Sequence, residues 1–274
     1  MPKSPIEFWF DFSSGYAYFA ATTIDQLAAR HDRDVLWRPY MLGVAFKHTG
    51  VRGLSSTPMK GDYARHDWAR LSRQTGLPFS PPANHPITAL PASRAYYWVE
   101  EHVPMKAHDF ARAAFNAYFA EARDMTEPAN VAAVGAVIGL PQGDLEAGIT
   151  SDIMKAKVKA VSNEAIDKGI FGSPFFIVDA EPFWGWDRME MLESWLETGG
   201  GDGAGFPPME TLLLPSPPRK RGSRKRPQIQ SEADADWIPA YAGMTAGVLQ
   251  VQPEKDMEVR FWYPNIRFAD DSFL

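Results

Sequence analysis

A serine near the N-terminus is the residue of this chain best placed to do chemistry. Ser14 follows a short apolar, aromatic run at residues 6–12 and stands directly before a stretch with helical spacing. A strand that leads into a helix N-terminus presents unpaired backbone N–H groups, which favour an anion. The chain contains no cysteine, so disulfide exchange, a cysteine nucleophile and thiolate metal ligands are excluded. The site therefore suits a thiolate that another molecule supplies.

The elements around Ser14 predict an α/β domain split into two halves. Its expected strands and helices are, in chain order, a strand at 6–12, a helix at 15–30, a strand at 35–40, strands at 173–179 and 183–184 joined by a turn at 180–182, and a helix at 187–196. Because the first two strands are joined by a helix, we expect them to be parallel in a right-handed βαβ unit.

A helical block separates the two halves. Residues 42–86 are irregular and rich in Gly, Pro and Ser, apart from one amphipathic helix at about 61–75. The remaining helical segments, favoured by their pattern and alanine content, are expected at 92–103, 106–122 and 130–138, with one helix or two at 145–168. The order is thus βαβ, a helical block, then ββα.

Composition excludes several classes of function. The net charge of -6 gives no reason to expect a nucleic-acid partner. No apolar run is long enough to span a bilayer, and the first residues lack a signal-peptide pattern, so we expect a cytoplasmic protein that does not bind membranes. The histidines show no metal-ligand spacing, and no metal site is expected.

The composition changes at Gly199. A glycine-rich stretch is followed by prolines and a basic run at residues 219–226. Residues 217–222 and 237–245 resemble translated palindromic repeats of bacterial genomes. We expect a disordered tail at 198–274; nuclear targeting or nucleic-acid binding is the competing interpretation of the basic run.

Three motifs resemble one enzyme family. Residues 11–18, DFSSGYAY, are similar to the D-F-x-S-P-x-x-Y motif of 2-hydroxychromene-2-carboxylate isomerases and kappa-class glutathione transferases. Residues 169–174, GIFGSP, and 183–188, FWGWDR, resemble the family's G-V-F-G-V-P and F-W-G-x-D-R segments. The motifs occur in the family's order and at its spacing.

The resemblance implies the fold. It covers residues 5–197 and implies an α/β, thioredoxin-like fold with a helical insertion domain, of the DsbA and kappa glutathione transferase type. The thioredoxin halves are expected at about 5–45 and 165–197, and the insertion at about 46–164. Relatives are often dimers, which implies a homodimer.

By this resemblance Ser14 meets the sulfur of glutathione. Lowering a free thiol pKa of about 8.5 by about two units takes about 2.7 kcal/mol. A hydroxyl hydrogen bond to a charged acceptor supplies about 1.5–3 kcal/mol, and a helix N-terminus about 0.3–1 kcal/mol. The two together reach the required size. Considered alone, a serine at this position is typical of a helix N-cap.

The resemblance implies further residues that hold glutathione. Pro174 is expected to follow a cis peptide bond, so that the backbone of Ser173 pairs with the tripeptide. Trp186 and Asp187 are expected at its γ-glutamyl end, although an aspartate there is also typical of an N-cap. Lys60 matches a P-x-K-x-x-Y stretch whose lysine approaches the glycyl carboxylate.

The expected function is that of a glutathione-dependent cis–trans isomerase acting on an aromatic hydroxy acid such as 2-hydroxychromene-2-carboxylate. The alternatives are a kappa-like glutathione transferase and a non-catalytic thioredoxin-like binding module. Two positions depart from the family pattern: Gly15 stands where proline is usual, and Val51 where asparagine is usual. Valine cannot donate the hydrogen bonds of asparagine.

Overall fold

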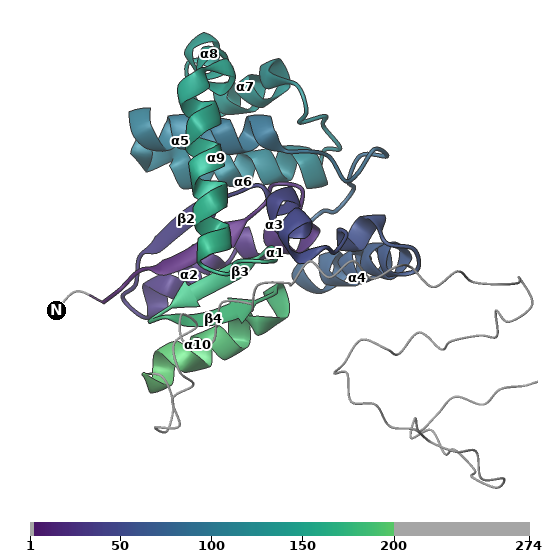
Figure 1. The fold of residues 1–274 in the computed structure, drawn as a ribbon, viewed down its shortest axis with the longest axis vertical. Helices are drawn as coiled ribbons and strands as arrows, with labels where there is room; N and C mark the ends of the chain where they lie inside the picture. The colour runs from purple at the N-terminus through teal and green to yellow at the C-terminus, as the bar shows by residue number, and fades with distance from the viewer. Residues whose placement is uncertain (1–2, 200–274) are drawn as a thin grey trace, which may run out of the picture. The chain divides into compact units, whose positions relative to one another are not determined.

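A four-stranded mixed sheet organises the chain in this computed structural model, which describes residues 3–199 (Figure 1). The strands are β1 (Ile6–Phe10), β2 (Val35–Pro39), β3 (Phe175–Val178) and β4 (Glu181–Trp184), in the order β2-β1-β3-β4. β1 is parallel to β2 and antiparallel to β3, and β4 is antiparallel to β3. The predicted thioredoxin-like α/β fold with a helical insertion is confirmed. The tail expected at 198–274 lies, beyond Gly199, outside the described residues.

The predicted helix at 15–30 is two helices. α1 (Gly15–Ala21) ends before two threonines, and α2 (Ile24–Arg30) begins after them. The Thr22 hydroxyl donates to the Phe19 carbonyl at 2.7 Å, so a side chain occupies an acceptor at the end of α1. Threonine side chains compete with the backbone in this way, and here the helix is interrupted where two of them are adjacent.

The helical insertion has the expected content. Its longer helices are α4 (Lys60–Thr75), α5 (Leu90–His102), α6 (Ala107–Phe119), α7 (Pro128–Val137), α8 (Gln142–Thr150) and α9 (Asp152–Asp167). The segment at 145–168, predicted as one helix or two, belongs to two helices, because Ser151 is extended (φ −65°, ψ 150°) and its side chain caps α9. The last turn of α9 leads directly into the loop before β3.

One helix was missed. α3 (Leu42–Thr49) lies at the start of the stretch predicted to be irregular. Gly43 and the flanking Gly50 lower its intrinsic helix propensity. The first N–H group of α3, from Leu42, donates to Asp11 Oδ2 at 3.0 Å. A contact with a distant residue thus caps a helix that the local sequence does not favour.

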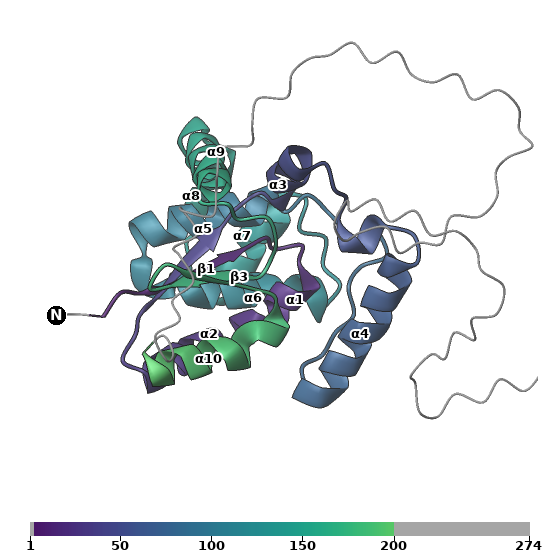
Figure 2. The same ribbon diagram turned by 60° about the horizontal axis from the view of Figure 1, so that its bottom comes forward.

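The C-terminal half contributes β3 and β4 to the sheet, followed by a last helix. Asp179 and Ala180 both have positive φ (51° and 69°) and form a two-residue turn, where a turn at 180–182 was predicted. After β4, a short 3₁₀ turn (Trp186–Arg188) precedes α10 (Met189–Thr198). Arg30 of α2 donates to Glu193 of α10 at 2.6 Å, and the two helices lie side by side (Figure 2).

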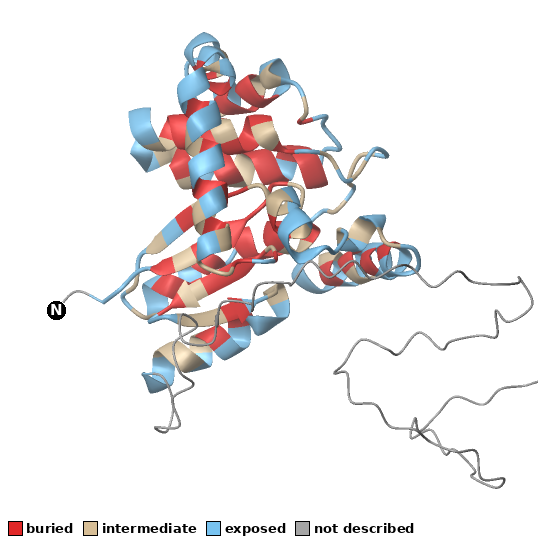
Figure 3. Ribbon diagram, in the orientation of Figure 1, coloured by how far each residue is buried: buried red, intermediate tan, exposed pale blue. Residues whose placement is uncertain are grey.

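Aromatic side chains fill the core. Phe8 stacks on Phe176 across the β1–β3 pair, with ring centroids 5.2 Å apart, and Phe10 meets Phe115 of α6 at 5.4 Å. Figure 3 shows the buried residues on the sheet, on α5 and on α6 as one continuous region. The insertion therefore packs directly on the thioredoxin halves. Within residues 3–199, no helix is both long and apolar enough to cross a membrane.

Candidate functional site

The turn between β1 and α1 places Ser14. Its N–H donates to the Asp11 carbonyl at 2.9 Å, and its hydroxyl oxygen accepts from the Ala17 N–H at 3.3 Å. Ser14 is therefore the N-cap of α1, as serine at such a position favours. The side chain is half-buried. Its structural role thus leaves the hydroxyl partly accessible.

Asp11 holds this turn and was missed as a site residue. Its carboxylate accepts from the Ser13 N–H (2.8 Å), the Ser13 hydroxyl (2.7 Å) and the Leu42 N–H (3.0 Å). Asp11 is 5 % exposed, and burial raises its pKa against the opposing effect of these hydrogen bonds. An aspartate two residues before a serine predicts the local turn; nothing local predicts the bond to α3.

A second segment completes the site from the other end of the chain. The Ser173–Pro174 peptide bond is cis, which confirms that prediction. The Ser14 hydroxyl donates to the Ser173 carbonyl at 2.8 Å, and the Asp11 N–H donates to Ser173 Oγ at 2.9 Å. The Tyr40 hydroxyl donates to the carbonyl of Gly172, the residue before Ser173, at 2.7 Å. The structure therefore brings Ser14, Ser173 and Pro174 together.

Hydrogen-bond donors remain free around Ser14. Within the described residues, no partner is found for the backbone N–H groups of Gly15, Tyr16 and Ser173. The Ser14 hydroxyl can rotate away from the Ser173 carbonyl, because hydroxyl donors have no fixed direction. α1 is only seven residues long, so its effect on a charge comes mainly from these first-turn N–H groups. The donor set suits an anionic sulfur and an extended peptide.

Packing explains the glycine after Ser14. A Cβ at Gly15 would lie 2.7 Å from Cε2 of Trp68, a distance that real Cβ atoms do not show. Trp68 belongs to α4 and is 3 % exposed, and its Nε1 atom is buried without a hydrogen-bond partner in the described chain. The indole thus occupies the space that a larger residue at position 15 would need.

Tyr16 links α1 to α4 at the edge of the site, and it was also missed. Its hydroxyl donates to Asp67 Oδ2 at 2.9 Å. Burial, then Asp67, and to a smaller extent Tyr63 and Asp187 raise the pKa of Tyr16. Lys60, Tyr63 and Asp67 stand at helical spacing on one face of α4, so Lys60 shares the face that meets Tyr16.

The residues expected at the two ends of glutathione lie at the periphery. Lys60 begins α4 and is exposed. The Asp187 side chain is 68 % exposed and lies 3.2 Å from Arg188 Nη1. No side chain caps α10, so the N-cap alternative for Asp187 is wrong. Trp186 meets Phe19 of α1 with ring centroids 6.4 Å apart. Within residues 3–199, no hydrogen bond or ion pair joins Lys60 or Asp187 to Ser14.

Comparison with known proteins identifies the family. Residues 5–197 match the family model described as a DSBA-like thioredoxin domain. The chain belongs to this family. Its DSBA-like domain is 25% identical over 193 residues to 2-hydroxychromene-2-carboxylate isomerase of Sphingobium xenophagum, covering 70% of this chain and 97% of that protein. It is 26% identical over 191 residues to the enzyme of the same name from Pseudomonas putida, covering 69% and 92%.

Solved structures share the fold of the DSBA-like domain. Selenomethionyl 2-hydroxychromene-2-carboxylate isomerase superposes with a TM-score of 0.64 at 24% identity, covering 70% of this chain and 94% of that one. The cytosolic disulfide reductase of Pseudomonas aeruginosa, in a structure with GSH, gives a TM-score of 0.50 at 15% identity, covering 72% and 98%. The fold is thus shared by isomerases and by disulfide oxidoreductases, and site residues must distinguish them.

Two remaining sequence features of the DSBA-like domain can be placed. Val51 follows α3 and is 55% exposed, so its side chain is not part of the core. His85 lies 2.9 Å from the Tyr118 hydroxyl through Nδ1, and its ring meets Trp68 edge-on at 5.4 Å. Burial lowers the pKa of His85 from 6.5 to about 4. His85 is therefore a neutral packing residue behind Trp68 at neutral pH, as predicted for histidines without ligand spacing.

Proposed function

We propose that this protein is a glutathione-dependent cis–trans isomerase acting on an aromatic hydroxy acid such as 2-hydroxychromene-2-carboxylate. One observation carries the proposal: the Ser14 hydroxyl lies 2.8 Å from the carbonyl that precedes the cis-proline, in a chain without cysteine. A thioredoxin-like site without its own thiol cannot exchange disulfides. The two relatives that carry the isomerase name support the substrate class.

Ser14 would stabilise the thiolate form of glutathione. Its hydroxyl would turn from the neutral Ser173 carbonyl to a charged sulfur, and hydrogen bonds to charged acceptors are about twice as strong as neutral ones. The free N–H groups of Gly15 and Tyr16 would add to this effect. When bound, glutathione supplies a nucleophilic sulfur whose reversible addition to a conjugated enone lets a double bond rotate. The protein need not provide a general base for this step.

The remaining residues would hold the tripeptide. The Ser173 N–H is free to donate to a peptide carbonyl next to Pro174. Lys60 carries the charge that complements the glycyl carboxylate, and Asp187 carries the charge that complements the γ-glutamyl ammonium. Both side chains are exposed, and the ion pair of Asp187 with Arg188 at 3.2 Å is exposed as well, so binding does not require a buried partner to be displaced. Trp186 would cover the γ-glutamyl end.

The test compares Ser14→Ala with Ser151→Ala. Ser151 caps α9 through the same type of bond, from the Met154 N–H at 3.2 Å, but lies among none of the proposed site residues. Each substitution is expected to cost about 1 kcal/mol of stability as a lost cap. Only Ser14→Ala should lower glutathione-dependent turnover, by about 100-fold, and abolish the proton release that accompanies glutathione binding in calorimetry near neutral pH. Equal turnover in the two variants would contradict the proposal.

A kappa-like glutathione transferase is the second candidate, and Val51 is the observation that favours it. An exposed valine cannot donate the hydrogen bonds of the asparagine it replaces, so the chemistry at the acceptor can differ while glutathione still binds. Product analysis separates the two functions: glutathione is consumed by a transferase and regenerated by an isomerase. If neither the wild type nor Ser14→Ala binds millimolar glutathione, the protein is a non-catalytic module instead.

A further inference from the structure

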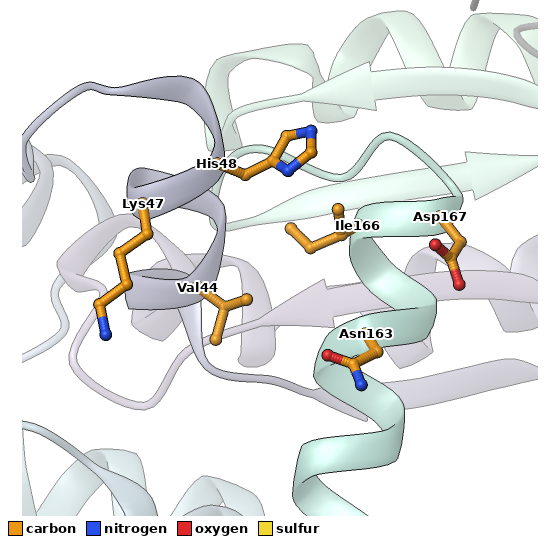
Figure 4. A pocket seen from close by; sticks show the side chains of 6 residues that line it. All are labelled: Val44, Lys47, His48, Asn163, Ile166 and Asp167. Carbon is orange, nitrogen blue, oxygen red and sulfur yellow. The ribbon is translucent and has the colours of Figure 1, made fainter. Parts of the chain in front are cut away.

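A cleft between α3, α5 and α9 lies apart from the residues assigned to glutathione. Its wider part, about 550 Å³, is bounded by α3 and the end of α9. Figure 4 shows Val44 and Ile166 projecting into this space from the two helices, with His48 beside them. A narrower part, about 230 Å³, shares Val44 and Asn163 with it and reaches α5. The lining of the narrow part is completed by Met41, Leu90, Arg94, Lys155, Val158, Lys159 and Ser162.

Arg94 is the unusual residue of this cleft. Its Nε atom is buried and has no hydrogen-bond partner, and no ion pair to its guanidinium is found within residues 3–199. Burial lowers the pKa of Arg94, as expected for a charge that loses water without gaining a counter-ion. A buried donor without an acceptor is costly, and an arginine fork is suited to a carboxylate. An anionic ligand in the cleft would pair with the terminal guanidinium nitrogens of Arg94, for which no partner is found in the described chain.

The charges around Arg94 favour an anion. Lys159 lines the same narrow part and has no ion-pair partner in the described chain, whereas Lys155 is held by Asp152 at 2.8 Å. Among the residues that line the two parts of the cleft, the single carboxylate is Asp167, in the last turn of α9. The cleft therefore has a surplus of positive charge where Arg94 lies, although the whole chain carries a net charge of -6.

The walls and the size of the narrow part favour an apolar ligand body. Leu90 and Val158, with Val44, provide aliphatic surface beside the guanidinium. A volume of about 230 Å³ is below the roughly 300–1,000 Å³ of sites for drug-sized ligands, so the occupant is small. A single aromatic ring bearing one carboxylate satisfies both the charge and the walls.

We propose that the cleft between α3, α5 and α9 binds a small aromatic carboxylate, whose carboxylate pairs with Arg94 and whose ring lies against Val44, Leu90 and Val158. The site is separate from Ser14, Ser173, Lys60 and Asp187, none of which lines it. The proposal therefore does not depend on the proposed isomerase activity.

The experiment titrates benzoate into the full chain and into Arg94→Gln, with calorimetry as the readout. Benzoate is expected to bind the wild type, and Arg94→Gln is expected to weaken its affinity by about tenfold or more. Arg73→Gln is the matched control, because Arg73 is an exposed arginine in the last turn of α4 and its loss changes the net charge equally. This control should bind benzoate as the wild type does. Glutathione affinity should be unchanged in both variants.

Further probes separate the two parts of the proposal. Benzyl alcohol, which keeps the ring without the charge, should not bind measurably. Inorganic phosphate should bind more weakly than benzoate; equal or tighter phosphate binding would overturn the aromatic part. The absence of benzoate binding at millimolar concentration, or equal weakening in Arg94→Gln and Arg73→Gln, would overturn the site. Thermal unfolding of Arg94→Gln verifies that the variant is folded, since removing an unpaired charge should not destabilise it.

Discussion

The turn at Asp11 and the turn at Asp124 are built from the same local bonds but behave differently. In each turn, the aspartate carboxylate accepts from the N–H and from the hydroxyl of the residue two positions later. Asp11 accepts from the Ser13 N–H at 2.8 Å and its hydroxyl at 2.7 Å, and Asp124 accepts from the Thr126 N–H at 2.9 Å and its hydroxyl at 2.7 Å. Burial raises the pKa of Asp11, whereas the side-chain and backbone hydrogen bonds from Thr126 lower the pKa of the exposed Asp124. The same three-residue pattern thus serves two different environments.

The difference arises from tertiary contacts. Asp11 is 5 % exposed, and its second oxygen caps α3 through Leu42, while Asp124 lies on the surface. The buried Asp11 carboxylate accepts hydrogen bonds from two elements that are distant in the sequence, and it therefore helps to position Ser14. The exposed Asp124 carboxylate stabilises only its own turn. The burial of such a turn, rather than its local hydrogen bonds, decides how far removal of the aspartate side chain lowers the free energy of unfolding.

The largest expected effect tests this comparison directly. Asp11→Ala should lower the free energy of unfolding by about 3–4 kcal/mol, because the partly buried N–H groups of Ser13 and Leu42 lose their buried acceptor. Asp124→Ala, which removes the same local bonds in water, should cost less than about 1 kcal/mol. Urea denaturation of both variants measures the two values. Similar costs would show that burial does not separate the turns.

The effect of burial on a pKa can also be tested on a base, His85. Since burial lowers the pKa of His85 from 6.5 to about 4, the unfolded chain takes up a proton in this range that the native state does not. The stability that His85 contributes is complete above pH 6.5 and is lost as the pH falls through this window, by about 2–3 kcal/mol. His85→Gln should flatten the pH dependence of urea unfolding between pH 7 and 4. The same change at the exposed His48 is the control and should not flatten it.

Two helical glycines test packing in the same manner. Gly15→Ala should lower the free energy of unfolding by about 1–2 kcal/mol, because its Cβ would lie 2.7 Å from buried Trp68. Gly43 of α3 has open space within 4 Å, so Gly43→Ala should stabilise the protein by about 0.5–1 kcal/mol. Thermal unfolding of the pair gives opposite shifts if the indole fixes Gly15. A Gly15→Ala protein as stable as the wild type would show that Trp68 moves freely.

The smallest effect on stability is expected at the exposed periphery. Asp187→Asn should change the free energy of unfolding by less than about 0.5 kcal/mol, since the side chain is 68 % exposed. If Asp187 holds the γ-glutamyl ammonium, the same variant should weaken glutathione binding by about tenfold in calorimetry. Glu190→Gln, an exposed charge in the first turn of α10, is the control and should bind normally. Unchanged binding in Asp187→Asn would remove this residue from the proposed site.

Local sequence patterns predicted which helices and strands exist better than they predicted the residues at which these elements begin and end. The aromatic runs located the strands, and helical periodicity located the helices of the insertion. The break between α1 and α2 was missed because Thr22 and Thr23 are compatible with a helix by pattern, and only their back-bonding shows the interruption. α3 was missed because the group that caps it is the side chain of Asp11, 31 residues earlier.

The residues of the candidate site also differ in how far the sequence predicted them. Ser14, Ser173 and Pro174 belong to recognisable motifs, and the structure brings them together with a cis bond at Pro174. Tyr16 and Trp68 are aromatic residues at helical spacing, and this pattern favours a core position. Their importance depends on what each one touches: Asp67 for Tyr16, and Gly15 for Trp68.

The sequence by itself determined the fold class, the absence of a thiol and the serine at the strand-to-helix turn. These follow from residue type and local spacing, which act over a few residues. Only the tertiary structure decided that Asp11 is buried, that the Ser14 hydroxyl meets the Ser173 carbonyl and that Arg94 lies in a cleft without a counter-ion. Such properties depend on desolvation and on partners 31 to 162 residues away, and no local pattern contains them.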